Sequence, residues 1–250
     1  MLRFFRQLRQ RLLTENKFSK YLLYAIGEIL LVVIGILIAL QLDQNAEKKQ
    51  QDKTRHEYYI QLLEDLKKDR KFTVETMARF EADEKAYEEY LELYAGPPLA
   101  PQKVYEHLMS LNIYSTAFSF NSNTIESLRS SGEIILIPLD IRNRLINLLR
   151  LQDNILKEVQ YNDTGKNNMI QELGIYRGAS TLESRLKGQP ELRKYLKFDE
   201  NLPKIILGLE SAIRWKNYSE TSSKNILQLM LDEIEVIIQM LEQEIEKFNP

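Results

Sequence analysis

A continuous apolar stretch near the start of the chain constrains the fold more than any other feature. Residues 21–42 read YLLYAIGEILLVVIGILIALQL, which is 22 residues with Glu28 as the one charged side chain. As a helix this stretch is roughly 33 Å long, enough to cross a bilayer core of about 30 Å. The pattern therefore predicts a transmembrane helix over residues 21–42.

A cleaved signal peptide is the rival interpretation of this stretch. The apolar region of a signal peptide usually has about 7–15 residues and is followed by a cleavage site of the A-x-A kind. Here the apolar run is longer, and its end reads Ala39-Leu40-Gln41. We therefore expect the helix to be retained as a membrane anchor.

The formal net charge of −2 hides a strong local asymmetry. Residues 1–20 carry a net charge of +5, whereas residues 43–250 are acidic. Because basic flanks stay in the cytoplasm, this predicts a single-pass membrane protein with a cytoplasmic N-terminus and with residues 43–250 outside the cytoplasm. Residues 1–20 form either a basic interfacial helix on membrane lipids or a plain topogenic segment. Nucleic acid is not an expected partner, because the apolar stretch that follows holds these basic residues at the membrane surface.

One face of the predicted span carries an acid and small residues. Glu28 and Gly35 are seven residues apart, and Gly35 forms a small-xxx-small pair with Ala39. Small residues let helices approach closely, and a protonated carboxyl can hydrogen-bond to a neighbouring helix. Glu28, Gly35 and Ala39 are therefore a candidate intramembrane interface of an oligomer. The alternatives are a tolerated polar residue near the membrane surface and, less favoured, part of an ion path.

Two phrases resemble a known family of membrane proteins. They are KYLLYAIGEILLVVIGILIALQL at the span and NTIESLRSSGEIILIPLDIRNRL further on, which are similar to an uncharacterised family of single-span proteins common in Bacteroidota. The chain departs from that family at Asp43-Gln44-Asn45, where Asn-Trp-Asn is frequent, and at Ile125, where Tyr is usual. The resemblance implies a bacterial inner membrane and carries no mechanism.

The region after the span has the pattern of an all-α bundle. The chain has only 9 Gly and 7 Pro, and residues 44–95 contain neither. A heptad row of mostly apolar residues predicts one long helix there, in which the tyrosines belong to the core or to a coiled-coil seam or, less often, line a ligand site. The row consists of Tyr59, Leu66, Thr73, Phe80, Tyr87 and Tyr94. The first and last long helices are expected to pack antiparallel.

Turn residues divide the rest of this bundle. Prolines and Gly96 end the first helix, and a short helix is expected over residues 102–111. Asp140 is the predicted N-cap of a helix through about Tyr161, followed by short helices and loops over residues 162–202. Pro203 suits the first turn of a last long helix that runs to about Phe248.

The intervening stretch, residues 115–131, is rich in Ser, Thr and Asn. Asn123 and Glu126 resemble a capping box for a helix that Gly132 ends. The apolar run over residues 133–137 is either buried extended chain or a helical turn. The polar side chains of residues 115–131 are more often turn caps than a binding site for a small polar ligand or a partner.

Motifs for chemistry are scarce, so no catalytic, cofactor-binding or metal-binding residue is predicted. The chain has no Cys and only two histidines, His56 and His107. Ser184 and Lys187 match SxxK, but the companion motifs of that nucleophile are missing. The single tryptophan, Trp215, is predicted to be a core anchor.

These observations favour a non-enzymatic, membrane-anchored helical protein that assembles with itself or with a partner in the cell envelope. The alternative is an extracytoplasmic module that binds a ligand as a sensor or accessory protein, because bundles can hold small ligands between helices. Such a sensor would need a separate transmitter. A hydrolase or other enzyme is the least favoured reading, since it requires perturbed titratable residues in a deep pocket.

Overall fold

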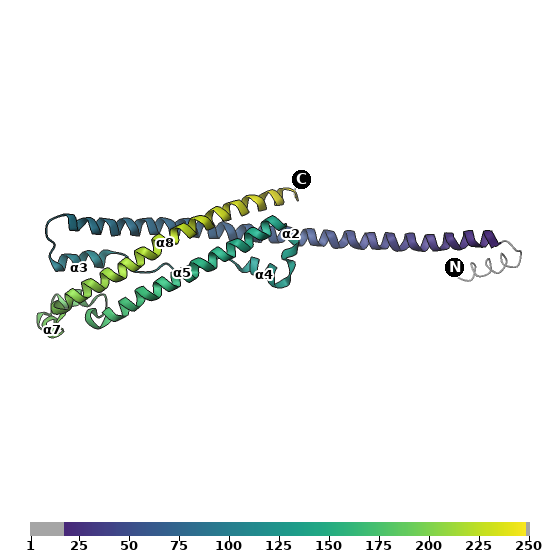
Figure 1. Ribbon diagram of the computed structural model, residues 1–250. Coiled ribbons are helices and arrows are strands. Elements are labelled where there is room, and N and C mark those ends of the chain that lie inside the picture. The colour runs from purple at the N-terminus through teal and green to yellow at the C-terminus, as the bar shows by residue number, and fades with distance from the viewer. Residues whose placement is uncertain (1–17, 249–250) are drawn as a thin grey trace. The chain divides into compact units, whose positions relative to one another are not determined.

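The computed structural model describes residues 18–248, and the regular elements of that part are all helical (Figure 1). The predicted all-α class is confirmed for this part of the chain. In chain order the elements are α2 (Phe18–Glu92), η1 (Leu93–Ala95), α3 (Pro101–Ser110), α4 (Asn123–Ser131), η2 (Glu133–Leu136), α5 (Leu139–Arg177), α6 (Leu182–Leu186), α7 (Pro190–Tyr195) and α8 (Phe198–Glu246).

The chain divides into two compact units, Met1–Glu57 and Tyr58–Pro250, and α2 contributes to both. In the first unit, α2 carries the apolar stretch, which is long and apolar enough to cross a membrane. Its side chains are uncovered: Leu23 is 76% exposed and Leu31 is 74% exposed. Except for the first residues of α2, the basic segment predicted over residues 1–20 lies outside the described residues.

The second unit is built on three long helices, namely residues 58–92 of α2, together with α5 and α8. Near the start of this part of α2, Lys67 pairs with Glu242 of α8 at 3.1 Å. Further along α2, Asp83 pairs with Lys216 of α8 at 2.6 Å. Residue numbers thus rise along α2 while they fall along α8, so the predicted antiparallel packing of the first and last long helices is confirmed.

Helix α5 packs against α8 along most of its length, and Figure 1 shows the two side by side. At one end Arg144 pairs with Glu233 at 2.8 Å, and further along Glu158 accepts a hydrogen bond from Ser222. From the first contact to the second, residue numbers rise along α5 and fall along α8. Helix α8 is therefore antiparallel to both α2 and α5.

The bundle has two apolar cores with a polar layer between them. Along α8 the first core ends at Ile213 and the second begins at Leu227, and the buried residues between them are polar. The four are Lys216, Ser219, Glu220 and Ser223. On α5, the buried Asn162 and Lys166 occupy the same level between Ile155 and Leu173. Helical periodicity thus continues through the layer while the side chains change from apolar to polar.

The heptad row on α2 serves the core, as the structural interpretation predicted. Tyr59, Leu66, Thr73 and Phe80 are all at most 2% exposed. The row leaves the core at its end, because Tyr94 is 54% exposed. The predicted helix break also holds, since the chain leaves helical structure around Gly96 and resumes it at Pro101 in α3.

The predicted end of α5 is wrong, because the helix continues from Leu139 to Arg177 and passes through Gly165 and Gly174. A glycine in a helix costs only about 1 kcal/mol relative to alanine. Here the burial of Lys166 and Leu173 against α8 keeps the helix intact. At the other end Pro138 precedes the helix, so Asp140 lies in the first turn and is not the N-cap.

Two further boundaries differ from the sequence prediction. Helix α8 begins at Phe198, five residues before Pro203, since the buried Phe198 anchors the start in the core. Helix α4 begins at Asn123, so Ser122 stands at the cap position, and its hydroxyl donates to Glu126 at 2.7 Å. Gly132 ends α4 with φ 78°, as predicted. Residues 133–136 form the helical turn η2, which is one of the two alternatives that the sequence left open for this apolar run.

Candidate functional site

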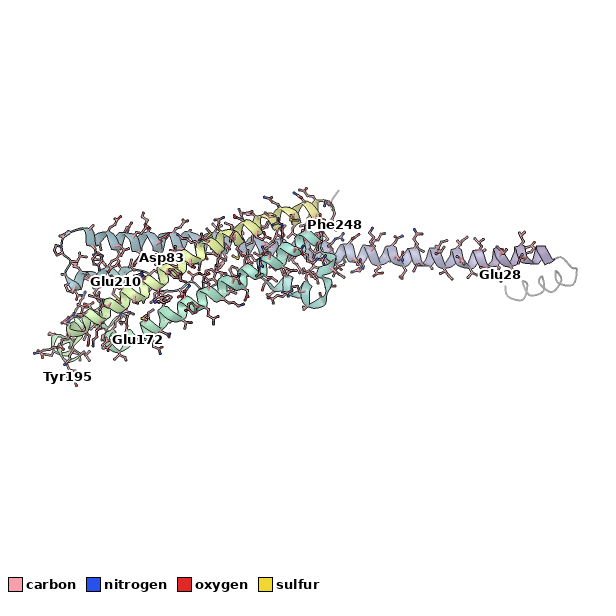
Figure 2. The ribbon with its side chains drawn as sticks, viewed as in Figure 1. Glu28, Asp83, Glu172, Tyr195, Glu210 and Phe248 are labelled. Carbon is pink, nitrogen blue, oxygen red and sulfur yellow. The ribbon has the colours of Figure 1, made fainter. Side chains whose placement is uncertain are left out.

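The candidate intramembrane interface lies on the part of α2 that belongs to the first unit. Glu28, which Figure 2 labels, is half-buried, whereas Gly35 and Ala39 are exposed. A Cβ atom added at Gly35 would meet no other atom within 4 Å. With 3.6 residues per turn, the three residues lie on nearly one side of the helix. That side therefore has room for the close approach of another helix.

The Ser- and Asn-rich segment is fixed to α2 by the buried carboxylate of Asp69 and the half-buried carboxylate of Asp65. Asp69, only 1% exposed, accepts hydrogen bonds from the backbone N–H of Asn121 at 2.8 Å and from its side-chain amide at 2.7 Å. Gln152 of α5 donates to the same carboxylate at 2.9 Å, and Thr124 donates to Asp65 at 2.5 Å. These polar side chains join the segment to the bundle by long-range hydrogen bonds, whereas the sequence predicted mainly turn caps.

A cluster of charged side chains forms the polar layer inside the bundle. The Nζ atom of Lys216 lies 2.6 Å from an Oδ atom of Asp83 and 2.7 Å from an Oε atom of Glu220. The lysine is 5% exposed and Glu220 is 7% exposed. The Asn112 amide also donates to Asp83 at 2.9 Å, from the chain after α3.

A second buried lysine completes the polar layer. Lys166 of α5 is 2% exposed, and its Nζ atom lies 3.4 Å from an Oδ atom of Asp163. The same ammonium donates to the Ser115 hydroxyl, which in turn donates to Asp163 at 2.5 Å. Each buried lysine therefore has a carboxylate partner, as buried charges require.

Burial changes the protonation of two acids in the bundle. It raises the pKa of Glu220 to about 7, although Lys216 and Lys166 act in the opposite direction. It also raises the pKa of Asp69, although hydrogen bonds from Asn121 and Gln152 act to lower it. In both cases the low dielectric of the interior disfavours the carboxylate more than its partners stabilise it.

The polar layer has little room for a substrate. Two small voids adjoin it, each of about 10 Å³, and Lys216 and Glu220 line both. A void of this size holds about one water molecule. The perturbed carboxyl of Glu220 therefore sits in packed protein and not in a pocket where chemistry could take place.

A much larger groove of about 730 Å³ lies between α5 and α8. Its lining combines three aromatic side chains with one acid, one base, one amide and one hydroxyl. The lining residues are Glu158, Tyr161, Asn162, Ser211, Arg214, Trp215 and Tyr218. Ligand sites commonly have volumes of about 300–1,000 Å³ and combine aromatic walls with a few polar groups. By size and lining, this groove is the best candidate for a binding site in the described part of the chain.

The prediction that Trp215 is a core anchor is wrong. Its side chain is half-buried, belongs to neither apolar core, and lines the groove. Sequence analysis also missed Tyr161, Asn162 and Tyr218. The available signal was the step from Tyr161 to Gly165, which places an aromatic residue and a gap on one face of a helix.

The SxxK pair has no nucleophilic geometry. The Ser184 hydroxyl donates to the backbone carbonyl of Thr181 at 2.8 Å, and Ser184 is exposed. Within residues 18–248, no group of three His, Asp or Glu side chains is placed to hold a metal ion.

No family model, curated protein or solved structure matches the chain.

Proposed function

We propose that this chain is a non-enzymatic, membrane-anchored helical protein of the bacterial inner membrane that assembles with itself or with an envelope partner. The observation that carries the proposal is the row of uncovered apolar side chains on α2, for which the described chain offers no cover. Exposed apolar area of this extent is unfavourable in water by about 25 cal/mol per Å², so a bilayer is its expected surrounding. The sequence resemblance to single-span Bacteroidota proteins supports the same location.

The proposal includes an orientation, with residues 43–250 in the periplasm. The chain has no cysteine, so a single introduced cysteine reports its own accessibility. Tyr195, labelled in Figure 2, is 83% exposed and suits this purpose. Tyr195→Cys should react with a membrane-impermeant maleimide in intact spheroplasts, whereas Gln7→Cys should react only after lysis. The reverse pattern would show the opposite orientation.

Assembly through the face of Glu28, Gly35 and Ala39 is tested by native mass spectrometry of gently solubilised protein. We expect a multiple of the 29.5 kDa chain mass, or added mass from a partner. The double variant Glu28→Gln, Gly35→Leu should lose that extra mass, because a larger side chain blocks close helix approach. Val33→Leu is the matched control, because Val33 lies two residues before Gly35 and on another side of the helix. Unchanged mass in the double variant would refute assembly through this face.

The groove between α5 and α8 favours a second candidate function, an extracytoplasmic ligand-binding module. Its volume of about 730 Å³ is typical of small-molecule sites, unlike the small voids beside the polar layer. A membrane-anchored bundle with such a site would act as an accessory or sensory protein. Binding of any small ligand that changes the fluorescence of Trp215 would support this candidate.

A further inference from the structure

The floor of the groove is an indole that packs flat on the backbone of α5. A Cβ atom added at Gly165 would lie 3.7 Å from three atoms of the Trp215 ring, Cδ2, Cε2 and Cε3. Equal distances to three fused-ring atoms place Gly165 over the face of the ring. One face of the indole is thus held by α5, while the side chain also lines the groove.

Two tyrosines extend this aromatic surface. Tyr161 of α5 is 75% exposed and Tyr218 of α8 is 63% exposed, and neither belongs to an apolar core. The bundle therefore gains little packing from them. Together with Trp215 they give the groove aromatic groups from both helices that bound it.

The side-chain amide of Asn162 is available to a ligand in the groove. Its side chain is 4% exposed and lines the groove, and no residue of the described chain hydrogen-bonds to its side-chain amide. A carboxamide offers both donors and an acceptor. The amide of Asn162 can therefore both donate to and accept from the hydroxyl groups of a ligand in the groove.

The formal charges of the groove cancel. Arg214 and Glu158 carry opposite charges, and Glu158 already accepts a hydrogen bond from Ser222. A strongly charged ligand would gain little from this balance. The matching ligand is neutral, has an apolar face for the aromatic rings, and has a rim of groups that both donate and accept hydrogen bonds.

We infer that the groove between α5 and α8 is a carbohydrate-binding site. A pyranose ring has an apolar C–H face that stacks on indole and phenol rings. Its hydroxyls donate to and accept from the Asn162 amide, and they also accept from Arg214. The inference rests on the second candidate function, ligand binding by the bundle, and names the class of ligand.

The test uses Trp215 as its own reporter, because it is the single tryptophan of the chain. The full chain in detergent micelles is titrated with maltose, cellobiose and chitobiose up to millimolar concentrations, and tryptophan fluorescence is recorded. At least one of the three disaccharides should give a saturable change. Benzyl alcohol, which does not absorb at 295 nm, and tetramethylammonium serve as aromatic and cationic probes of the same groove.

Variants locate the binding. Tyr161→Ala and Asn162→Leu should each weaken saccharide affinity about tenfold, the effect of losing roughly 1.4 kcal/mol of contacts. Tyr114→Ala removes a tyrosine of similar exposure, 78%, that does not line the groove, and it should leave affinity unchanged.

The outcomes separate the inference from the function on which it rests. A response to benzyl alcohol or tetramethylammonium with none to the saccharides would overturn the carbohydrate assignment and keep the ligand-binding module. No response to any probe would overturn both. An equal loss of saccharide affinity in Tyr114→Ala would place the binding outside the groove and refute the inference.

Discussion

The ammonium of Lys216 and the carboxylate of Asp83 meet at 2.6 Å inside the bundle and join α8 to α2 (Figure 2 labels Asp83). The lysine side chain is 5% exposed and also touches Glu220 at 2.7 Å. This ion pair lies at the level where the two apolar cores end. The layer around it makes the relative position of the helices specific, because a shift of either helix would leave charges buried without partners.

Lys216→Met should destabilise the bundle by about 3 kcal/mol, because it leaves the half-buried carboxylate of Asp83 and the buried carboxyl of Glu220 without their shared cation. Lys224→Met is the matched control, since Lys224 also joins α8 to α2 but its pair with Glu84 is more exposed. Its loss should cost about 1 kcal/mol or less. Urea unfolding of the full chain in micelles, followed by Trp215 fluorescence, measures both, and equal losses would contradict this role for the buried layer.

The stability of the bundle should fall as the pH rises from about 4.5 to 7. Burial raises the pKa of Glu220 from an ordinary value of 4.5 to about 7, so the folded state holds a proton that the unfolded state releases. The contribution is complete below pH 4.5 and is lost as pH approaches 7, amounting to roughly 3 kcal/mol at ~1.4 kcal/mol per pKa unit.

Glu220→Gln tests this pH dependence. The variant should flatten the decline in unfolding free energy between pH 4.5 and 7, because its amide does not titrate. Glu89→Gln, which alters an exposed acid paired with Lys85 on the surface of α2, should keep the decline. A decline of the same size in Glu220→Gln would assign it to other groups.

Asp69→Ala should loosen the segment that crosses from α3 to α4. The variant removes the acceptor of three hydrogen bonds, two from Asn121 and one from Gln152. Loss of these buried bonds should cost roughly 3 kcal/mol and speed amide exchange of Asn121. Hydrogen-exchange mass spectrometry of residues 112–122 measures this. Glu126→Ala, which removes the exposed partner of Ser122, should leave the exchange of Asn121 unchanged.

Two helical glycines should respond in opposite ways to alanine. At Gly208 a Cβ atom would overlap the side chain of Leu173, with only 2.7 Å to Cγ, so Gly208→Ala should destabilise by about 1–3 kcal/mol. At Gly174 nothing lies within 4 Å, so Gly174→Ala should stabilise by about 1 kcal/mol through helix propensity. Thermal unfolding compares the two variants. Adding Leu173→Ala should reduce the penalty of Gly208→Ala, and independent effects would rule out the overlap.

The locations of helices followed from local patterns, but some of their ends did not. Gly96 and the prolines after it end the helix, because proline lacks a backbone N–H and has a fixed φ that packing against a neighbour cannot change. At Gly165 and Gly174, by contrast, the local penalty of about 1 kcal/mol is smaller than the packing of α5 against α8. Residues 162–177, which the sequence predicted to belong to a region of short helices and loops over residues 162–202, are therefore part of α5.

Of the two candidate sites, the sequence indicated the interface on α2 but not the groove between α5 and α8. Glu28, Gly35 and Ala39 were recognisable because they share one helix and one short spacing. The groove needs Asn162 and Trp215 from two helices, and each residue alone resembles an ordinary core residue.

The sequence by itself determined the membrane-length apolar helix, the all-α class and the antiparallel packing of the first and last long helices. These depend on composition and on periodicity within one segment. The tertiary structure decided the polar layer and the groove. Asp83 and Lys216 are 133 residues apart, and their meeting depends on the register of two antiparallel helices. That register is set by the summed packing of two cores, which no local pattern specifies.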